Sequence, residues 1–203
     1  LFAPKKIKRA LLIVFSSDRG LCGSFNTELF QKTLELLGVL GETCETEFVV
    51  IGKKGQERAV RQGWNMVASF DNLSVGSEFN DISPIAHIAL QGFLEKKYDR
   101  VFLAYTDYVS TIKQKSVIHE LLPITRSEDL GDVETNMRKK DEAEEKAKYN
   151  FTFKYEPSKD VVLEFILPRA IKLQIYQALL ESTASEQAAR MVAMKNASDA
   201  ALD

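Results

Sequence analysis

Apolar residues near the start of the chain recur in blocks with two kinds of spacing. The block at residues 10–15 is continuously apolar, which is typical of a strand buried on both faces of a parallel sheet. Residues 29–37 place Leu and Phe three and four positions apart, which predicts a helix stopped by Gly38 and Gly41. Residues 48–51 are again continuously apolar. The pattern predicts a strand, a helix and a second buried strand.

The alternation continues along the chain. We predict a short charged helix at 55–62, closed by Gly63, and a third strand at 64–70. Ser83 and Pro84 predict the start of another helix, with Ser83 as its cap and Pro84 in its first turn. The buried stripe of this helix is expected to contain Ile85, Ile88, Ala89 and Phe93.

Two further strands are predicted at 101–105 and 116–122. The segment between them is too short for a helical crossover, so we expect a hairpin that adds an antiparallel edge to the sheet. The predicted fold class is therefore α/β, with a Rossmann-like, mostly parallel sheet and flanking helices.

The middle of the chain has a different composition. Charged residues dominate 127–148, which we interpret as a solvent-facing insertion. Residues 150–155 alternate, with Phe151, Phe153 and Tyr155 on one face, and predict an edge strand. We expect a globular α/β domain over residues 1–158 and a helical segment over 159–203.

The last segment, residues 169–203, contains neither Gly nor Pro. At about 1.5 Å per residue it predicts a helix roughly 50 Å long. A stripe along this helix has the spacing of a surface that packs closely on another helix, yet no earlier segment has a comparable length and period. The partner helix is expected to be missing or supplied by another molecule. The stripe contains Leu173, Tyr176, Leu180, Thr183, Gln187, Met191 and Met194.

Charge and cysteine usage exclude some classes of protein. The 27 basic and 29 acidic side chains give a net charge of -2, so the composition does not favour nucleic-acid binding. The two cysteines are too few for a disulfide framework and suggest a reducing compartment. No run of about 18 uncharged apolar residues occurs, so we do not expect insertion into a membrane.

The loop at residues 16–26 follows the first strand, where α/β proteins usually bind ligands. A strand, a glycine loop and a helix start together provide amide donors for a phosphate. However, Gly20-x-x-Gly23 matches neither the dinucleotide fingerprint nor the Walker pattern. A small α/β enzyme that binds a phosphorylated ligand at residues 17–26 stays as the alternative hypothesis.

The structural interpretation assigns each loop residue a role in the fold. Gly20 and Gly23 would turn the chain with positive φ, and Asn26 would cap the next helix. Asp18 and Arg19 would tie the loop together. Two apolar residues, Leu21 and Phe25, would fill the space beneath it.

Other candidate chemistry is weaker. Cys22 is interpreted as a small packing residue. Neither His87 nor His119 has a Cys or carboxylate residue at the spacing of a metal site. Residues 52–55, Gly-Lys-Lys-Gly, are interpreted as a surface turn. We therefore expect no catalytic residue, no cofactor and no metal site.

Several stretches together carry a family resemblance. Residues 17–26, SDRGLCGSFN, and residues 184–197, ASEQAARMVAMKNA, are the specific ones, and 121–123 and 155–157 add weaker matches in the same order. They identify the chain as similar to the gamma subunit of F-type ATP synthases, the central-stalk rotor. The resemblance implies a Rossmann-like domain beside an antiparallel coiled coil. It also implies that this chain lacks the N-terminal helix and the distal C-terminal helix of the family.

The function implied by the resemblance is mechanical. A rotor subunit transmits torque between the ion-driven membrane ring and the catalytic α3β3 head during ATP synthesis, without a catalytic site of its own. The implied partners are the α and β subunits, the epsilon subunit and the c-ring. The implied location is peripheral to the membrane, on the cytoplasmic face of a bacterial inner membrane or the matrix or stroma face of an organelle.

The resemblance also implies two contact regions. Tyr155 and Glu156 would lie at the foot, near the ring and epsilon. A second set would lie in the coiled coil below the head: Glu186, Arg190, Met191, Met194 and Lys195. A third hypothesis is an adaptor that uses its C-terminal helix to dimerise.

Overall fold

The computed structural model describes residues 7–41, 43–73, 76–124 and 159–202. The chain forms two compact units, one of residues 1–123 and 168–203 and one of residues 124–167. The predicted insertion at 127–148, the predicted strand at 150–155 and the foot residues Tyr155 and Glu156 lie outside the described residues. The division of the chain at residue 158 stays a prediction.

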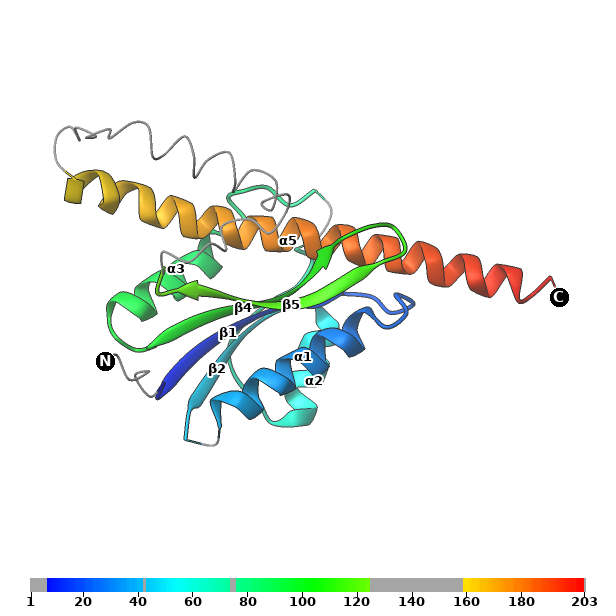
Figure 1. Cartoon of the computed structure of the whole chain (residues 1–203), viewed down its shortest axis with the longest axis horizontal. Helices are drawn as coiled ribbons and strands as arrows, with labels where there is room; N and C mark the ends of the chain where they lie inside the picture. The colour runs from blue at the N-terminus through cyan, green and yellow to red at the C-terminus, as the bar shows by residue number, and fades with distance from the viewer. Residues whose placement is uncertain (1–6, 42, 74–75, 125–158, 203) are drawn as a thin grey trace, which may run out of the picture. The chain divides into compact units, whose positions relative to one another are not determined.

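The first unit is built on a five-stranded sheet in the order β3-β2-β1-β4-β5 (Figure 1). Strands β1 to β4 are parallel to one another where they pair, and β5 runs antiparallel to β4. The predicted antiparallel edge is therefore confirmed. The strands are β1 (Arg9–Phe15), β2 (Glu45–Ile51), β3 (Asn65–Phe70), β4 (Arg100–Tyr108) and β5 (Gln114–Leu122).

Helices cover both faces of this sheet, with α1 and α2 on one face and α3 and α5 on the other (Figure 1). Alternate residues of β1 enter the two cores: Leu12 and Val14 pack on the side of α1, and Ile13 packs on the side of α3 and α5. All three side chains are fully buried, which explains why β1 is continuously apolar. The helices are α1 (Phe25–Leu40), α2 (Lys53–Gln62), α3 (Ser83–Leu94) and α5 (Lys159–Asp199).

The predicted helix stops at Gly41 and Gly63 are confirmed, whereas the predicted stop at Gly38 and the predicted cap at Ser83 are wrong. α1 continues through Gly38 and ends at Leu40, because the left-handed turn falls at Gly41, with φ 75°. α2 ends at Gln62 with Gly63 as its C-cap, at φ 66°, as predicted, and it begins two residues before the predicted start at residue 55. At α3 the N-cap is Ile82, so Ser83 is the first helical residue rather than the cap. Pro84 lies in the first turn, as predicted.

α5 begins at Lys159, ten residues before the helix predicted from the run without Gly or Pro at 169–203, and contains Pro168. An interior proline removes one backbone hydrogen bond, which led the sequence prediction to start the helix after it. Among the described residues, no helix is both long and apolar enough to span a membrane.

α5 packs on the sheet through a face other than the predicted stripe. Its buried face contains Ile171, Ile175, Ala178, Leu179, Ser182, Ser185 and Ala188. In contrast, Leu173, Leu180, Met191 and Met194 of the predicted stripe are each about half exposed. The apolar residues of α5 therefore form two faces, of which one is buried by the first unit.

Candidate functional site: the loop after β1 and the helix beside it

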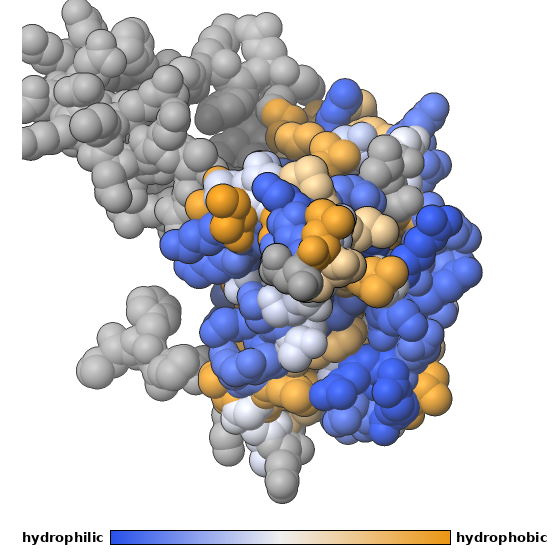
Figure 2. Space-filling view, turned by 90° about the vertical axis from the view of Figure 1, so that its right-hand side faces the viewer, coloured by the Kyte–Doolittle hydropathy of each residue, from blue (hydrophilic) through white to orange (hydrophobic). Residues whose placement is uncertain are grey.

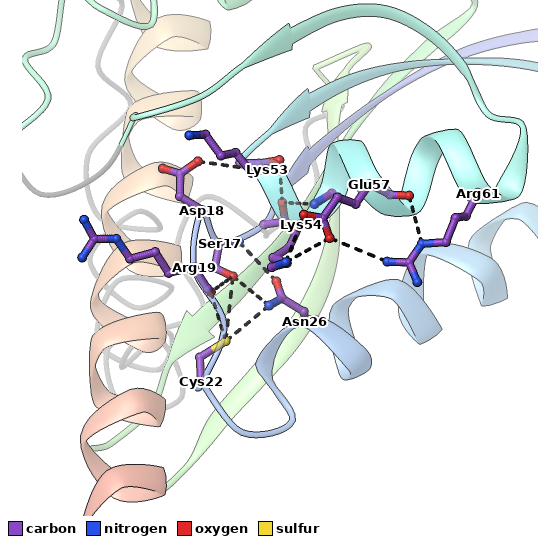
Figure 3. A network of polar contacts seen from close by, with 12 residues as sticks. Ser17, Asp18, Arg19, Cys22, Asn26, Lys53, Lys54, Glu57 and Arg61 are labelled. Carbon is purple, nitrogen blue, oxygen red and sulfur yellow. Dashed lines mark hydrogen bonds and ion pairs between the residues drawn. The ribbon is translucent and has the colours of Figure 1, made fainter.

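Asp18 joins three parts of the sheet edge (Figure 3). Its Oδ1 accepts a hydrogen bond from the Lys53 amide at 3.2 Å, at the start of α2. Its Oδ2 accepts one from the Asn72 amide at 3.1 Å, after β3. Asp18 therefore connects the loop after β1 to the loops after β2 and β3, in agreement with its predicted tying role.

The first amides of α2 are all used by this loop. Besides Lys53, the Lys54 amide donates to the Ser17 carbonyl at 3.0 Å, and the Gly55 amide donates to Ser16 Oγ at 2.8 Å. A helix N-terminus offers such amides to an anion when they are free. Here the carboxylate of Asp18 occupies the position of that anion.

Asn26 does not cap α1, so this prediction is wrong. The N-cap is Ser24, and Asn26 lies in the first turn with its side chain directed back to the loop. Its Oδ1 accepts from the Ser17 amide at 3.2 Å, and its Nδ2 donates to Ser17 Oγ at 2.7 Å and to Cys22 Sγ at 3.3 Å (Figure 3). Asn26 thus closes the loop as a ring of internal hydrogen bonds.

The backbone of the loop turns at Leu21 and Gly23, with φ 62° and 57°. The prediction of a positive φ is confirmed for Gly23 and wrong for Gly20. Leu21 is 76% exposed and does not fill the space beneath the loop, whereas Phe25 is buried as predicted. A left-handed residue with a large exposed side chain is unfavourable by itself, so the surrounding hydrogen bonds must hold it.

Gly52 and Gly55 are the functional positions that sequence reasoning missed, since residues 52–55 were expected to form a surface turn. Both glycines are buried under the loop. A Cβ atom on Gly52, which has φ 91°, would lie 2.2 Å from the Ser16 carbonyl oxygen. A Cβ on Gly55 would lie 2.5 Å from Ser16 Oγ. The pair of glycines after β2 was the available signal.

α5 reaches the same edge of the sheet through two buried serines. Ser182 Oγ donates to the Phe15 carbonyl at 3.2 Å, at the end of β1. Ser185 Oγ donates to the Thr106 carbonyl at 3.1 Å, near the end of β4. These residues were not singled out from the sequence, although small residues three positions apart signal close packing.

The expected coiled-coil residues fall into two groups. Glu186 and Arg190 form an ion pair one turn apart, and Arg190 Nη1 also donates to Gln187 Oε1 at 3.0 Å. Met191, Met194 and Lys195 are exposed. Their assignment as partner contacts stays a prediction.

A hollow of about 550 Å³ lies between the loop and α5. Its walls combine apolar and charged side chains, and the Arg19 side chain extends from the loop towards α5 (Figure 3). Asp18 and Glu186 balance Arg19 and Arg190 in the lining. Among the described residues, no group of His, Cys, Asp and Glu could hold a metal ion. The lining includes Phe15, Leu73, Leu179, Ser182, Thr183 and Met194.

We expect the variant Asp18→Asn to lower the free energy of unfolding by about 1–2 kcal/mol, because the amide nitrogen of Asn cannot accept from a backbone N–H. Urea unfolding of both proteins measures the difference. Asp71→Asn, an exposed aspartate in the turn after β3, is the matched control and should change the free energy by less than about 0.5 kcal/mol. Equal effects of the two substitutions would contradict the role of Asp18.

Tyr105 of β4 lies near acidic groups of β4 and α5. Burial raises its pKa to about 12, and the charges of Glu181 and Asp107 add to the effect. The pKa of Glu181 is also raised, mainly by burial. The carboxyl groups of Glu181 and Asp107 therefore lie near the buried phenol of Tyr105 on one flank of α5.

This raised pKa predicts a loss of stability at high pH. Because the folded state keeps Tyr105 protonated, its contribution is complete below the ordinary pKa of 10 and disappears as the pH rises through about 12. Unfolding measured from pH 8 to 12 should show a steeper decline for the unsubstituted chain than for Tyr105→Phe. Parallel declines would show that Tyr105 ionises normally.

The fold and the loop define a class of protein before any comparison. The chain contains a Rossmann-like α/β unit. At the edge of its sheet where such folds usually bind ligands, Asp18 binds the amides of Lys53 and Asn72, and the long helix α5 packs against the strand ends. A family model described as ATP synthase matches residues 1–203, so the chain belongs to that ATP synthase family.

Curated relatives and solved structures agree with this assignment. The ATP synthase gamma chain of Legionella pneumophila (strain Corby) is 36% identical over 98% of this chain and 65% of its own length. That of Roseiflexus castenholzii is 38% identical over 95% of this chain and 61% of its own length. The chain thus spans less than two thirds of these curated relatives. The predicted resemblance to gamma subunits is confirmed.

Among solved structures, the central stalk and c-ring structure of the Tetrahymena thermophila mitochondrial ATP synthase contains a similar chain. The match has a TM-score of 0.70 and 27% identity, and covers 97% of this chain and 79% of that one. A rotor structure of the Euglena gracilis mitochondrial ATP synthase, at 19% identity and a TM-score of 0.62, supports the fold alone.

Proposed function

We propose that this chain is part of a rotor, the central stalk of an F-type ATP synthase, and transmits torque between an ion-driven membrane ring and a catalytic α3β3 head. The gamma chains among its relatives and the central-stalk structure support the proposal. The proposed partners are the α and β subunits, the epsilon subunit and the c-ring.

The observation that carries the proposal is the exposed face of α5. Positions 173, 177, 180, 184, 187, 191 and 194 alternate in steps of four and three, which is the heptad spacing of a coiled coil. All seven residues are exposed in the first unit, and four of them are Leu or Met. Figure 2, which faces the end where α5 finishes, shows apolar side chains at the surface among polar ones. A second helix on this face would complete a stiff stalk.

The site supports a mechanical role without chemistry of its own. The first amides of α2, which could bind an anion if they were free, donate to Ser16, Ser17 and Asp18 instead. We also propose a location for the protein: it is a peripheral part of a membrane-associated complex, on the cytoplasmic, matrix or stroma face of the membrane. The foot contact at Tyr155 and Glu156 is part of this proposal, as are the coiled-coil contacts from Glu186 to Lys195.

Purification of the full-length natural protein from its own membranes tests the proposal. The α, β, epsilon and ring subunits should co-purify with it. Recovery of the protein without any of them would count against the rotor function. Recovery as a pair of identical chains would instead support the adaptor hypothesis.

The alternative, an enzyme that binds a phosphorylated ligand at residues 17–26, has a separate test. We expect titration with nucleotides and sugar phosphates to show no binding to the chain. Binding that the substitution Gly23→Val abolishes would support the enzyme and contradict a purely structural loop.

A further inference from the structure

The face of α5 that packs on the sheet combines large side chains, Ile171, Ile175 and Leu179, with small ones. Ala178, Ser182 and Ser185 are all buried small residues, which let the helix approach the strand ends closely. Small side chains interlock little with their neighbours, so they resist rotation of a helix about its own axis poorly. Directional contacts on the flanks of α5 add to the resistance that Ile171, Ile175 and Leu179 provide.

One flank of α5 is held by the loop before α3. The Lys172 ammonium lies 4.3 Å from the centre of the Phe79 ring and donates to Asn80 Oδ1 at 3.0 Å. The Tyr176 ring meets Phe79 edge to face, with 5.5 Å between ring centres. The Tyr176 hydroxyl donates to the Ser77 carbonyl at 3.3 Å. We call these five residues the clasp.

The other flank is held by β4. Ser185 Oγ donates to the Thr106 carbonyl, and Glu181 faces Tyr105 and Asp107. At about 100° per residue, Lys172 and Ser185 are roughly 140° apart around the helix axis. Rotation of α5 about its axis therefore displaces two sets of contacts at once, the clasp and the contact with β4.

We propose that the clasp, together with Ser185, sets the rotational position of α5 in the first unit, so that a torque on the unit turns the helix with it. Lys172 and Phe79 are the positioning residues. The inference rests on the proposed rotor function, because resistance to twisting has a use where torque is transmitted. Among the described residues, Ser77, Phe79 and Asn80 do not line the hollow beside Asp18.

The contacts of the clasp also distinguish its role from simple coverage of the core. Tyr176 packs against the core on the side of α3, and Phe79 packs against Tyr176, as other large apolar residues could also do. The cation over the ring and the bond to Asn80 depend instead on the charge and reach of Lys172. Lys172→Met keeps the apolar stem and removes both contacts, whereas Lys172→Arg keeps a cation over the ring.

Hydrogen exchange of the chain tests the clasp directly. Lys172→Met should speed exchange in residues 77–83 about two- to fivefold, the factor expected from loss of one exposed cation–π contact. Lys172→Arg should exchange as the unsubstituted chain does. Lys32→Met, an exposed lysine of α1, is the matched control and should leave residues 77–83 unchanged. No acceleration with Lys172→Met would overturn the clasp.

A second measurement tests its mechanical use in the full-length protein, assembled in its complex and reconstituted into vesicles. The readout is the number of ions pumped per ATP hydrolysed, which a residue that serves only stability would not change. Lys172→Met should lower this ratio, and Lys172→Arg should restore it. Faster exchange with an unchanged ratio would overturn the mechanical role alone. Failure of the unsubstituted protein to assemble or pump would overturn the proposed function and the mechanical role together.

Discussion

Replacing Gly52 with Ala is expected to lower the free energy of unfolding by more than about 3 kcal/mol, a large part of the roughly 5–15 kcal/mol that stabilises a typical domain. The new Cβ would lie 2.2 Å from the Ser16 carbonyl oxygen and 2.7 Å from its carbon. Both are backbone atoms at the end of β1, so neither moves without breaking the junction of β1 and α2. The φ of 91° adds strain for any residue with a side chain.

Gly38→Ala is the matched control for this experiment. Gly38 lies inside α1, and a Cβ there would meet no atom within 4 Å outside the nearby backbone of α1 and its two chain neighbours, so Ala should stabilise the helix by about 0.5–1 kcal/mol. Urea unfolding of both variants measures the change in the free energy of unfolding, which should be a loss for Gly52→Ala and a gain for Gly38→Ala. A loss below about 1 kcal/mol for Gly52→Ala would show that the β1 loop does not pack as closely on α2 as described.

Ile175→Ala is expected to lower the free energy of unfolding by about 2–5 kcal/mol. Ile175 is fully buried at the centre of the contact between α5 and the sheet, so truncation removes apolar contact and leaves a cavity. Thermal or urea unfolding measures this loss. The result tests which face of α5 belongs to the first unit.

Leu173→Ala separates the two faces of α5. Leu173 is 57% exposed, so in this chain its truncation should cost less than about 0.5 kcal/mol. In the assembled full-length protein we expect a larger loss, because the proposed coiled coil would bury Leu173. Equal losses for Ile175→Ala and Leu173→Ala in the chain would contradict the assignment of the faces.

Much of the fold follows from hydrophobic spacing. The continuous apolar run of β1 predicts a central strand because each of its faces contacts a separate core. The short connection between β4 and β5 predicts their hairpin. The sequence also indicated the exposed stripe of α5. It did not distinguish this stripe from the second face of α5, which packs on the sheet. Serine and alanine positions such as Ser182 and Ser185 carry no periodic hydrophobic signal.

The loop after β1 was predicted in outline and not in detail. The string SDRGLCGSFN identified the family, and Asp18 was given the right kind of role. The partner of each side chain depends on tertiary structure, however. Asn26 bonds Ser17 rather than capping α1, and the left-handed turn lies at Leu21 rather than Gly20. Local propensity favours the opposite choices, and the contacts with α2 override it.

The same loop occupies part of the sheet edge where α/β proteins usually bind ligands. In this fold the carboxyl edge of the strands is the usual binding place. Here Asp18, Ser16 and Ser17 satisfy the amides of α2, and α5 closes on the edge through Ser182 and Ser185. The edge thus becomes the attachment site of a helix. A helix attached at this edge agrees with the proposed role of the protein in transmitting torque.

The most direct test of the rotor function follows a probe on the protein during catalysis. Cys22 and Cys44 are buried, so Val60→Cys, at a position that is 74% exposed on α2, gives one accessible thiol for labelling among the described residues. The labelled full-length protein is assembled with α and β subunits held on a surface, and ATP is added. The rotor function predicts that the probe turns continuously in one direction. A complex that hydrolyses ATP while the probe stays fixed relative to the head would contradict it.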